Sequence, residues 1–296
     1  MSWRHGLTIP YALKTVMANT ETTTANPELL QEQVASLLVQ PLEAASVVLS
    51  SGPRIFDTAS PLRIPKLTSG ASVGFVAEGG EIPEAGVDFG EVVLMPSTRT
   101  SLKCLIRFTN ELLRQSVIGL DATLKQRLVT DVANALDTAL LTGAGADASI
   151  TGLIHQTDVQ TGILDVTDAD CLLDAIALAS AAEVQPNRWF ISGADFISLR
   201  KLKDLQDRYL LESDVTKDVT YRLFGIPVTV TNKLATGTAI LCDTSMIAIA
   251  RDLAPSVTLL SERYAEFDEQ AIRVVTRYDL GLLHPEGVIV LTVGGS

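Results

Sequence analysis

The one stretch of this sequence that matches a known catalytic motif is GASVG at residues 70–74. Gly70, Ser72 and Gly74 fit the G-x-S-x-G pattern, in which a sharp strand-to-helix turn exposes a nucleophilic serine. Phe75 and Val76 follow, and they lead into a loop rich in Gly and Pro rather than into a helix. A serine hydrolase that uses Ser72 is therefore a remote alternative. Its test is fluorophosphonate labelling that the Ser72→Ala substitution abolishes.

The other residues that could do chemistry lack the spacing that chemistry needs. Glu78, Glu81 and Glu84 could bind a hard cation, but a solvated loop face explains them more simply. The histidines and cysteines are few and far apart, with neither metal-ligand nor CxxC spacing. They are His5, His155, His284, Cys104, Cys171 and Cys242. We expect no catalytic residue, no metal site and no cofactor.

Composition excludes two classes of protein and favours self-association. The 296-residue chain has a net charge of −12, the opposite of what a protein that grips nucleic acid needs. No apolar run approaches the roughly 20 residues that a bilayer demands, so we expect no membrane. Yet 47% of the residues are hydrophobic and only 20% are charged. A chain this apolar is expected to bury part of its surface against other chains.

Period-two patterning predicts a long two-stranded segment over residues 61–110. Residues 62–67 alternate, a short run follows at 73–76, and the chain returns through 91–96 into 98–108. A strand of about 13 residues spans roughly 40 Å. An isolated hairpin is marginal in water, so we expect another subunit to cover it.

The segments on either side of this hairpin do not have its period-two pattern. Residues 1–27 are rich in Thr and Asn and predict an extended arm, followed by a helix that should end near Pro41. Leucines every four residues over 120–140 predict the strongest helix, with Gly143 as its stop. Residues 165–262 alternate helix and strand. Three further strands are expected near 256–260, 271–278 and 288–293.

Several short motifs resemble those of tailed-bacteriophage major capsid proteins, which have the Hong Kong ninety-seven type shell fold. FVAEGGEIPE at 75–84, followed by FGEV at 89–92, is similar to their E-loop. TNELL at 109–113, LLTG at 140–143 and GLI at 152–154 also look like that family. The resemblance covers about residues 50–296 and is most specific between 75 and 154.

The resemblance implies an α+β fold in four parts. Residues 1–50 would be an N-terminal arm and 51–110 an extended E-loop hairpin. Residues 111–164 would form a peripheral domain with the long spine helix, which the strands of 263–296 rejoin. Residues 165–262 would be an α/β axial domain at the centre of hexamers and pentamers.

The implied function is that of a structural subunit of an icosahedral phage capsid, assembled in the host bacterial cytoplasm and found in the virion. Its partners would be other copies of itself, a portal protein and packaged double-stranded DNA, held only non-specifically. Either a separate scaffold protein serves it or none does. The loop tip, residues 77–90, has no lysine, so we expect a shell without covalent cross-links.

Two alternatives share or replace this role. An encapsulin-type nanocompartment has the same fold but encloses enzyme cargo, and a monomeric binding module would form no particle. Within the shell reading, aromatic and acidic residues of the loop are the expected inter-subunit contacts. They are Phe75, Glu78, Glu81 and Phe89.

Overall fold

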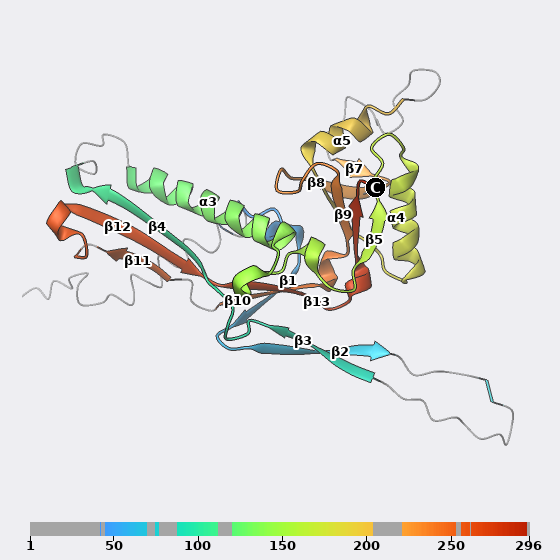
Figure 1. Cartoon of the computed structure of the whole chain (residues 1–296), viewed down its shortest axis with the longest axis horizontal. Helices are drawn as coiled ribbons and strands as arrows, with labels where there is room; N and C mark the ends of the chain where they lie inside the picture. The colour runs from blue at the N-terminus through green and yellow to red at the C-terminus, as the bar shows by residue number, and fades with distance from the viewer. Residues whose placement is uncertain are drawn as a thin grey trace, which may run out of the picture.

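The computed structural model describes residues 42, 45–69, 75–76, 88–111, 120–203, 221–252, 256–260 and 262–294. Helices and strands are mixed, as expected for an α+β fold. Figure 1 shows an elongated molecule with a long helix, a compact sheet-and-helix unit at one end and a two-stranded hairpin that projects from the body. Short 3₁₀ turns lie at Leu49–Ser51, Ala146–Ala148, Leu153–His155, Thr244–Met246, Ala265–Phe267 and Pro285–Gly287.

The compact unit is built on a six-stranded sheet. Its strands, in spatial order, are β5 (Gln160–Ile163), β14 (Val288–Thr292), β9 (Thr238–Cys242), β6 (Arg188–Ile191), β8 (Ile226–Val230) and β7 (Arg222–Leu223). Helices α4 (Asp170–Ala181) and α5 (Gly193–Arg200) accompany it. The central strands β6 and β9 are almost entirely buried. Trp189 and Leu241 pack there with Leu172 and Ala175 of α4.

Of the C-terminal strands, β14 lies in this sheet, whereas β12 (Glu269–Thr276) pairs with β4 (Leu102–Thr109) beside the long helix. Residues 263–296 were expected to rejoin the domain of the long helix, but β14 pairs antiparallel with β9 and parallel with β5. The fully apolar run 288–291 suits a strand buried on both faces, which this sheet provides and a half-exposed one does not.

The long helix α3 (Leu120–Thr142) confirms the strongest helix prediction. Its 23 residues span about 35 Å, and Leu128, Val132, Leu136 and Leu140 form its buried stripe. It ends at Gly143, where an added Cβ would lie 2.3 Å from the Ile150 carbonyl oxygen. A glycine is therefore required for the chain to turn back this closely.

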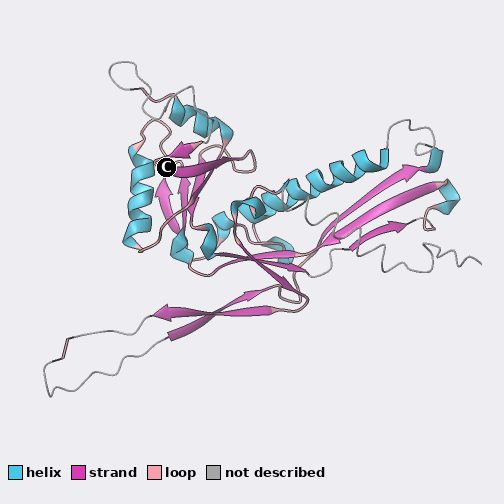
Figure 2. Ribbon diagram, turned by 180° about the vertical axis from the view of Figure 1, so that it is seen from behind, coloured by secondary structure: helices cyan, strands magenta, loops and turns pink. Residues whose placement is uncertain are grey.

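The sheet beside α3 has the order β11 (Ser256–Leu260), β12 (Glu269–Thr276) and β4 (Leu102–Thr109), all antiparallel. Figure 2 shows it running alongside the helix. Phe108 of β4 is buried, and Leu102, Cys104 and Ile106 are half-buried on the same face. This confirms the predicted alternation of that strand.

A third sheet joins the parts, with β10 (Ile247–Asp252) between β1 (Arg54–Thr58) and β13 (Tyr278–Leu282). Just upstream of β1, Leu42 and Ala45 are helical, and the Ser46 N–H donates to the Leu42 carbonyl at 2.9 Å. Helical conformation is therefore present directly after Pro41, and the predicted helix end there stays a prediction. Proline lacks only its own N–H, so residues after it can continue in helical conformation. The predicted arm and helix upstream lie outside the described residues.

The projecting hairpin pairs β2 (Leu62–Ser69) with β3 (Asp88–Leu94), from Leu62 opposite Leu94 to Ser69 opposite Asp88. The eight residues of β2 span about 26 Å, and the predicted continuation of the hairpin over residues 70–87 lies largely outside the described residues. The return strand was expected to continue through residues 98–108. Instead the chain turns at Met95, where φ is +54°, and β4 joins β12.

Candidate assembly surface

The described part of the hairpin exposes apolar side chains, although an isolated molecule would be more stable with them buried. Phe75 is fully exposed, Phe89 of β3 is 76% exposed, and Val93 is 44% exposed. Only the root of the hairpin is covered, where Leu94 and Met95 pack on Ala248 and Ala250 of β10. Beyond the root, the described strands β2 and β3 point away from the body in both views (Figures 1 and 2). Exposed aromatic residues of this kind are typical of interface anchors.

Of the four predicted contact residues, the structure describes two. Phe75 and Phe89 are both exposed, but they lie at different positions along the arm and do not touch in the described structure. Glu78, Glu81 and the alternative nucleophile Ser72 lie outside the described residues. The prediction that these residues contact another subunit stays a prediction.

A buried ionic clamp holds the root of the hairpin. The Asp279 carboxylate of β13 has no exposed side-chain surface and forms an ion pair with the Arg99 guanidinium at 2.7 Å. It also accepts a hydrogen bond from the Met95 N–H at 2.8 Å. The clamp therefore fixes the backbone at the left-handed turn at Met95, directly after β3. A buried carboxylate paired and hydrogen-bonded in this way fixes geometry, because losing either partner leaves a charge without compensation.

Close packing reinforces that clamp. Gly281 of β13 lies under the hairpin, and an added Cβ there would meet Leu94 Cδ2 at 2.7 Å and Val92 Cγ1 at 2.8 Å. Arg99 also donates to the backbone carbonyls of Ala148 and Ser149 in the loop after α3. The direction in which the hairpin leaves the body is therefore set jointly by β13 and by the end of the long helix.

A second buried carboxylate ties the N-terminal segment to the long helix. Asp137 of α3 is only 2% exposed. It accepts hydrogen bonds from Ser46 Oγ at 2.6 Å, from the Val47 N–H at 2.8 Å and from the Val48 N–H at 3.2 Å. Free N–H groups at the start of a turn are satisfied best by a negative oxygen. Asp137 thus anchors the chain where it enters the body.

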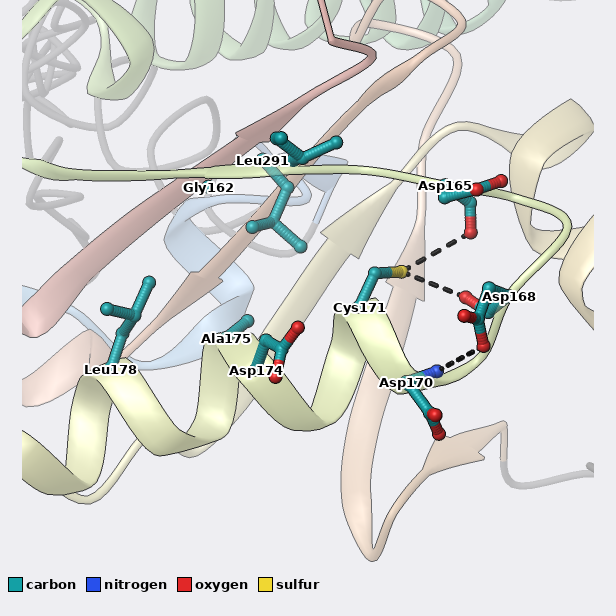
Figure 3. Close-up of a pocket in the computed structure, with 10 residues that line it drawn as sticks. Gly162, Asp165, Asp168, Asp170, Cys171, Asp174, Ala175, Leu178 and Leu291 are labelled. Carbon is teal, nitrogen blue, oxygen red and sulfur yellow. Dashed lines mark hydrogen bonds between the residues drawn. The ribbon is translucent and has the colours of Figure 1, made fainter.

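A shallow groove lies between β5 and α4 (Figure 3). It encloses about 280 Å³. Its floor is apolar, with Gly162, Ala175, Leu178 and Leu291, and its rim is acidic. The rim carboxylates are Asp165, Asp168, Asp170 and Asp174. Hydrogen bonds from the Thr167 hydroxyl and N–H lower the pKa of Asp165, so this carboxylate is charged at neutral pH.

The thiols near this groove and in the core are not set up as nucleophiles. Burial raises the pKa of Cys171, whose Sγ lies 3.1 Å from the Asp168 carbonyl oxygen. Burial also raises the pKa of Cys242 to about 12. Nucleophilic cysteines need the opposite shift. His155 hydrogen-bonds the Gly143 carbonyl at 3.1 Å, and His284 precedes a Pro285 turn.

Two kinds of feature are absent from the described residues. No cluster of three or more His, Cys, Asp or Glu residues there could hold a metal ion. No helix there is long and apolar enough to cross a membrane. What these residues do provide is an anchored, exposed hairpin and a grooved sheet edge, which are features of binding surfaces rather than of a catalytic centre.

Residues 28–293 match the Phage capsid family. The chain belongs to this family. Among curated proteins, the major capsid protein of Halomonas phage phiHAP-1 is 33% identical over 107 residues. That match covers 36% of this chain and 17% of the relative, so the chain spans under a fifth of the relative's length.

Solved capsid structures share the fold. The capsid of an empty GTA particle with C5 symmetry matches with a TM-score of 0.69 at 16% identity, over 84% of this chain and 90% of that one. A Microbacterium phage Oxtober96 chain matches with a TM-score of 0.69 at 17% identity, over 84% and 91%. The predicted family and its α+β shell fold are thus confirmed. Membership in this structural family also confirms the prediction that the protein is not an enzyme.

Proposed function

We propose that this chain is the major capsid protein of a tailed phage or of a phage-like particle, and that copies of it assemble into a closed icosahedral shell. The observation that carries the proposal is the hairpin of β2 and β3. Its root is clamped by buried Asp279, while Phe89 and Val93 stay exposed beyond the root. A segment fixed in direction but uncovered on its apolar side suits contact with a neighbouring copy.

The family parts map onto the chain as follows. Residues 1–50 form the N-terminal arm and 51–110 the E-loop segment, with β2 and β3 as its projecting part. The helix α3 is the spine of the peripheral domain, whose strands β11 and β12 form a sheet with β4, the last strand of the 51–110 segment. The axial domain comprises the part of residues 165–262 that precedes β10, together with β5 and β14, because these two strands complete the six-stranded sheet.

The partners follow from this role and from charge. Other copies of the chain form hexamers and pentamers, and one vertex accepts a portal protein. Packaged DNA is enclosed without specific grip, since the net charge of −12 repels phosphate. The shell is held without covalent links between subunits, because residues 77–90 contain no lysine.

The test is the size of the purified chain. Light scattering after size-exclusion chromatography should give particles of many copies, and electron microscopy should show closed shells of uniform diameter. A monodisperse monomer across the accessible concentration range would contradict the proposal. Boiling the particles in detergent should then release single chains. A ladder of linked subunits would overturn the noncovalent part alone.

A further inference from the structure

The two edges of the six-stranded sheet differ in charge. β5 lies at one edge and β7 at the other. Around β5, residues 143–187 contain no Lys or Arg but seven acids. These are Asp147, Asp158, Asp165, Asp168, Asp170, Asp174 and Glu183. Contact between this acidic edge and another acidic surface is unfavourable, whereas contact with a basic surface is favourable.

The described residues around β7 are mainly cationic, whereas residues 204–220, outside the described structure, add five acids and two cations. Described residues 188–203 and 221–237 include six cations and a single acid, Asp195. The cations are Arg188, Arg200, Lys201, Lys203, Arg222 and Lys233. Asp195 is 3% exposed and accepts hydrogen bonds from Ser192 Oγ and the Gly237 N–H, so it does not offset them at the surface.

Each edge also exposes apolar side chains next to its charges. At the β5 edge, Ile163 is 67% exposed and Leu178 lines the groove of Figure 3. At the β7 edge, Ile197, Tyr221 and Phe224 are each more than 40% exposed. Charge beside exposed apolar surface is the composition of a protein–protein interface rather than of a solvated face.

The β7 edge ends in a tight turn with an unusual residue. Arg222 and Leu223 pair with Pro227 and Ile226, which leaves only Phe224 and Gly225 in the loop. Both have positive φ, +49° and +83°. This turn favours Asn or Gly at its first position, and a bulky residue there is rare. Backbone outliers of this kind concentrate at functional sites. Phe224 is 41% exposed in this strained turn, and the Arg222 guanidinium donates to the Gly225 carbonyl at 3.2 Å.

We propose that the turn of Arg222 and Phe224 in one copy docks into the groove between β5 and α4 of the next copy. The groove fits this occupant because its apolar floor can receive the ring and the arginine stem. The rim carboxylates Asp170 and Asp174 meet the guanidinium. Among the described residues, neither carboxylate has an ion pair within its own chain.

The geometry of the contact makes it propagate. Donor turn and acceptor groove lie on opposite edges of one sheet, about 24 Å apart for six strands. A contact between two different patches is head-to-tail, and it generates a ring when the rotation closes. The inference rests on the proposed function and adds to it which two edges join copies within one ring.

Cysteine cross-linking in assembled particles tests the contact. Ile163→Cys and Phe224→Cys are introduced together in a background of Cys104→Ser and Cys171→Ser, and a short bismaleimide is added. The two positions are too far apart to be linked within one chain. We expect a ladder of linked chains that stops at five or six. The matched control pairs Phe224→Cys with Leu173→Cys, which is 45% exposed on the far side of α4, and should give no ladder.

Charge reversal provides a second arm. Arg222→Glu or Asp174→Lys alone should raise the concentration needed for assembly by roughly tenfold, because each places like charges in contact. The double variant should recover most of that loss. Particles that form but give no ladder, or a double variant no better than the singles, overturn the contact and leave the proposed function standing. If the cysteine variant does not assemble, the charge pair decides. If the unmodified chain forms no particles, the proposed function fails and the contact falls with it.

Discussion

The hairpin of β2 and β3 and the central pair β6 and β9 are both ladders of short, apolar-rich strands, but they are completed differently. Trp189 and Leu241 of β6 and β9 have no exposed surface and lie in a core made within the chain. In the hairpin, Phe89 is 76% exposed, and beyond its root no described element covers it. Strands of similar patterning are therefore buried within the chain in one region and left exposed, as an interface for another copy, in the other.

Truncating the finished region should have the largest effect on folding. Trp189→Ala removes a fully buried indole and should lower the free energy of unfolding by about 3–5 kcal/mol. Chemical denaturation of unassembled subunits measures this. The matched variant Phe89→Ala should change that free energy by less than about 0.5 kcal/mol. Similar losses in the two variants would break the contrast between the regions.

The clamp at the root of the hairpin joins the two regions and should come next. Asp279→Ala leaves the Arg99 guanidinium and the Met95 N–H without their carboxylate, and should cost about 3 kcal/mol. Urea denaturation provides the value. The control is Asp57→Ala, which breaks a more exposed pair with Arg251. A loss for Asp279→Ala no greater than that of the control would show that the clamp does not organise the root.

The pH dependence of the Asp57 pair should be smaller still. Hydrogen bonding to Arg251 lowers the pKa of Asp57 from its ordinary 3.8, despite a small opposing effect of burial. Because the folded pKa is the lower one, the pair stabilises the fold above about pH 4, and this contribution is lost as the pH falls through the folded value. Its size should stay below about 1 kcal/mol.

Thermal melts of the parent chain and of Asp57→Asn between pH 2.5 and 6 check this. The difference in stability between them should be largest at pH 6 and shrink as the pH falls through the folded pKa of Asp57. A difference that grows as the pH falls would contradict the sign of the shift.

The smallest effect on folding should come with a large effect on assembly. Phe75→Ser combined with Phe89→Ser should leave the melting temperature of the unassembled subunit within about 2 °C, because both rings are exposed. Particle yield should fall sharply, since aromatic anchors dominate interface energy. Normal particles from this variant would remove these residues from the interface. Leu105→Ser, at a residue of β4 that is 47% exposed, serves as a matched surface control.

Sequence periodicity predicted the elements that follow one period and missed those whose identity depends on distant partners. The leucine spacing was enough for α3, and alternation was enough for β2, β3 and β4. It did not separate β12 from β13, nor find β1, β5 and β10, because each is short and its pairing is non-local.

The residues that organise the assembly surface were also missed. Asp279 meets Met95 across 184 positions, and Asp137 meets Ser46 across 91. In sequence each looks like any other acid. One signal was readable: the absence of Lys and Arg over residues 143–187 marks the acidic sheet edge before any fold is known.

Amide hydrogen exchange tests the central claim most directly, by comparing free subunits with assembled particles. The account predicts that β6 and β9 are strongly protected in both states. It predicts that β2 and β3 exchange quickly in free subunits and become protected only in particles, where a neighbouring copy covers them. Equal exchange of the hairpin in the two states would contradict the claim that it is an interface completed by another copy.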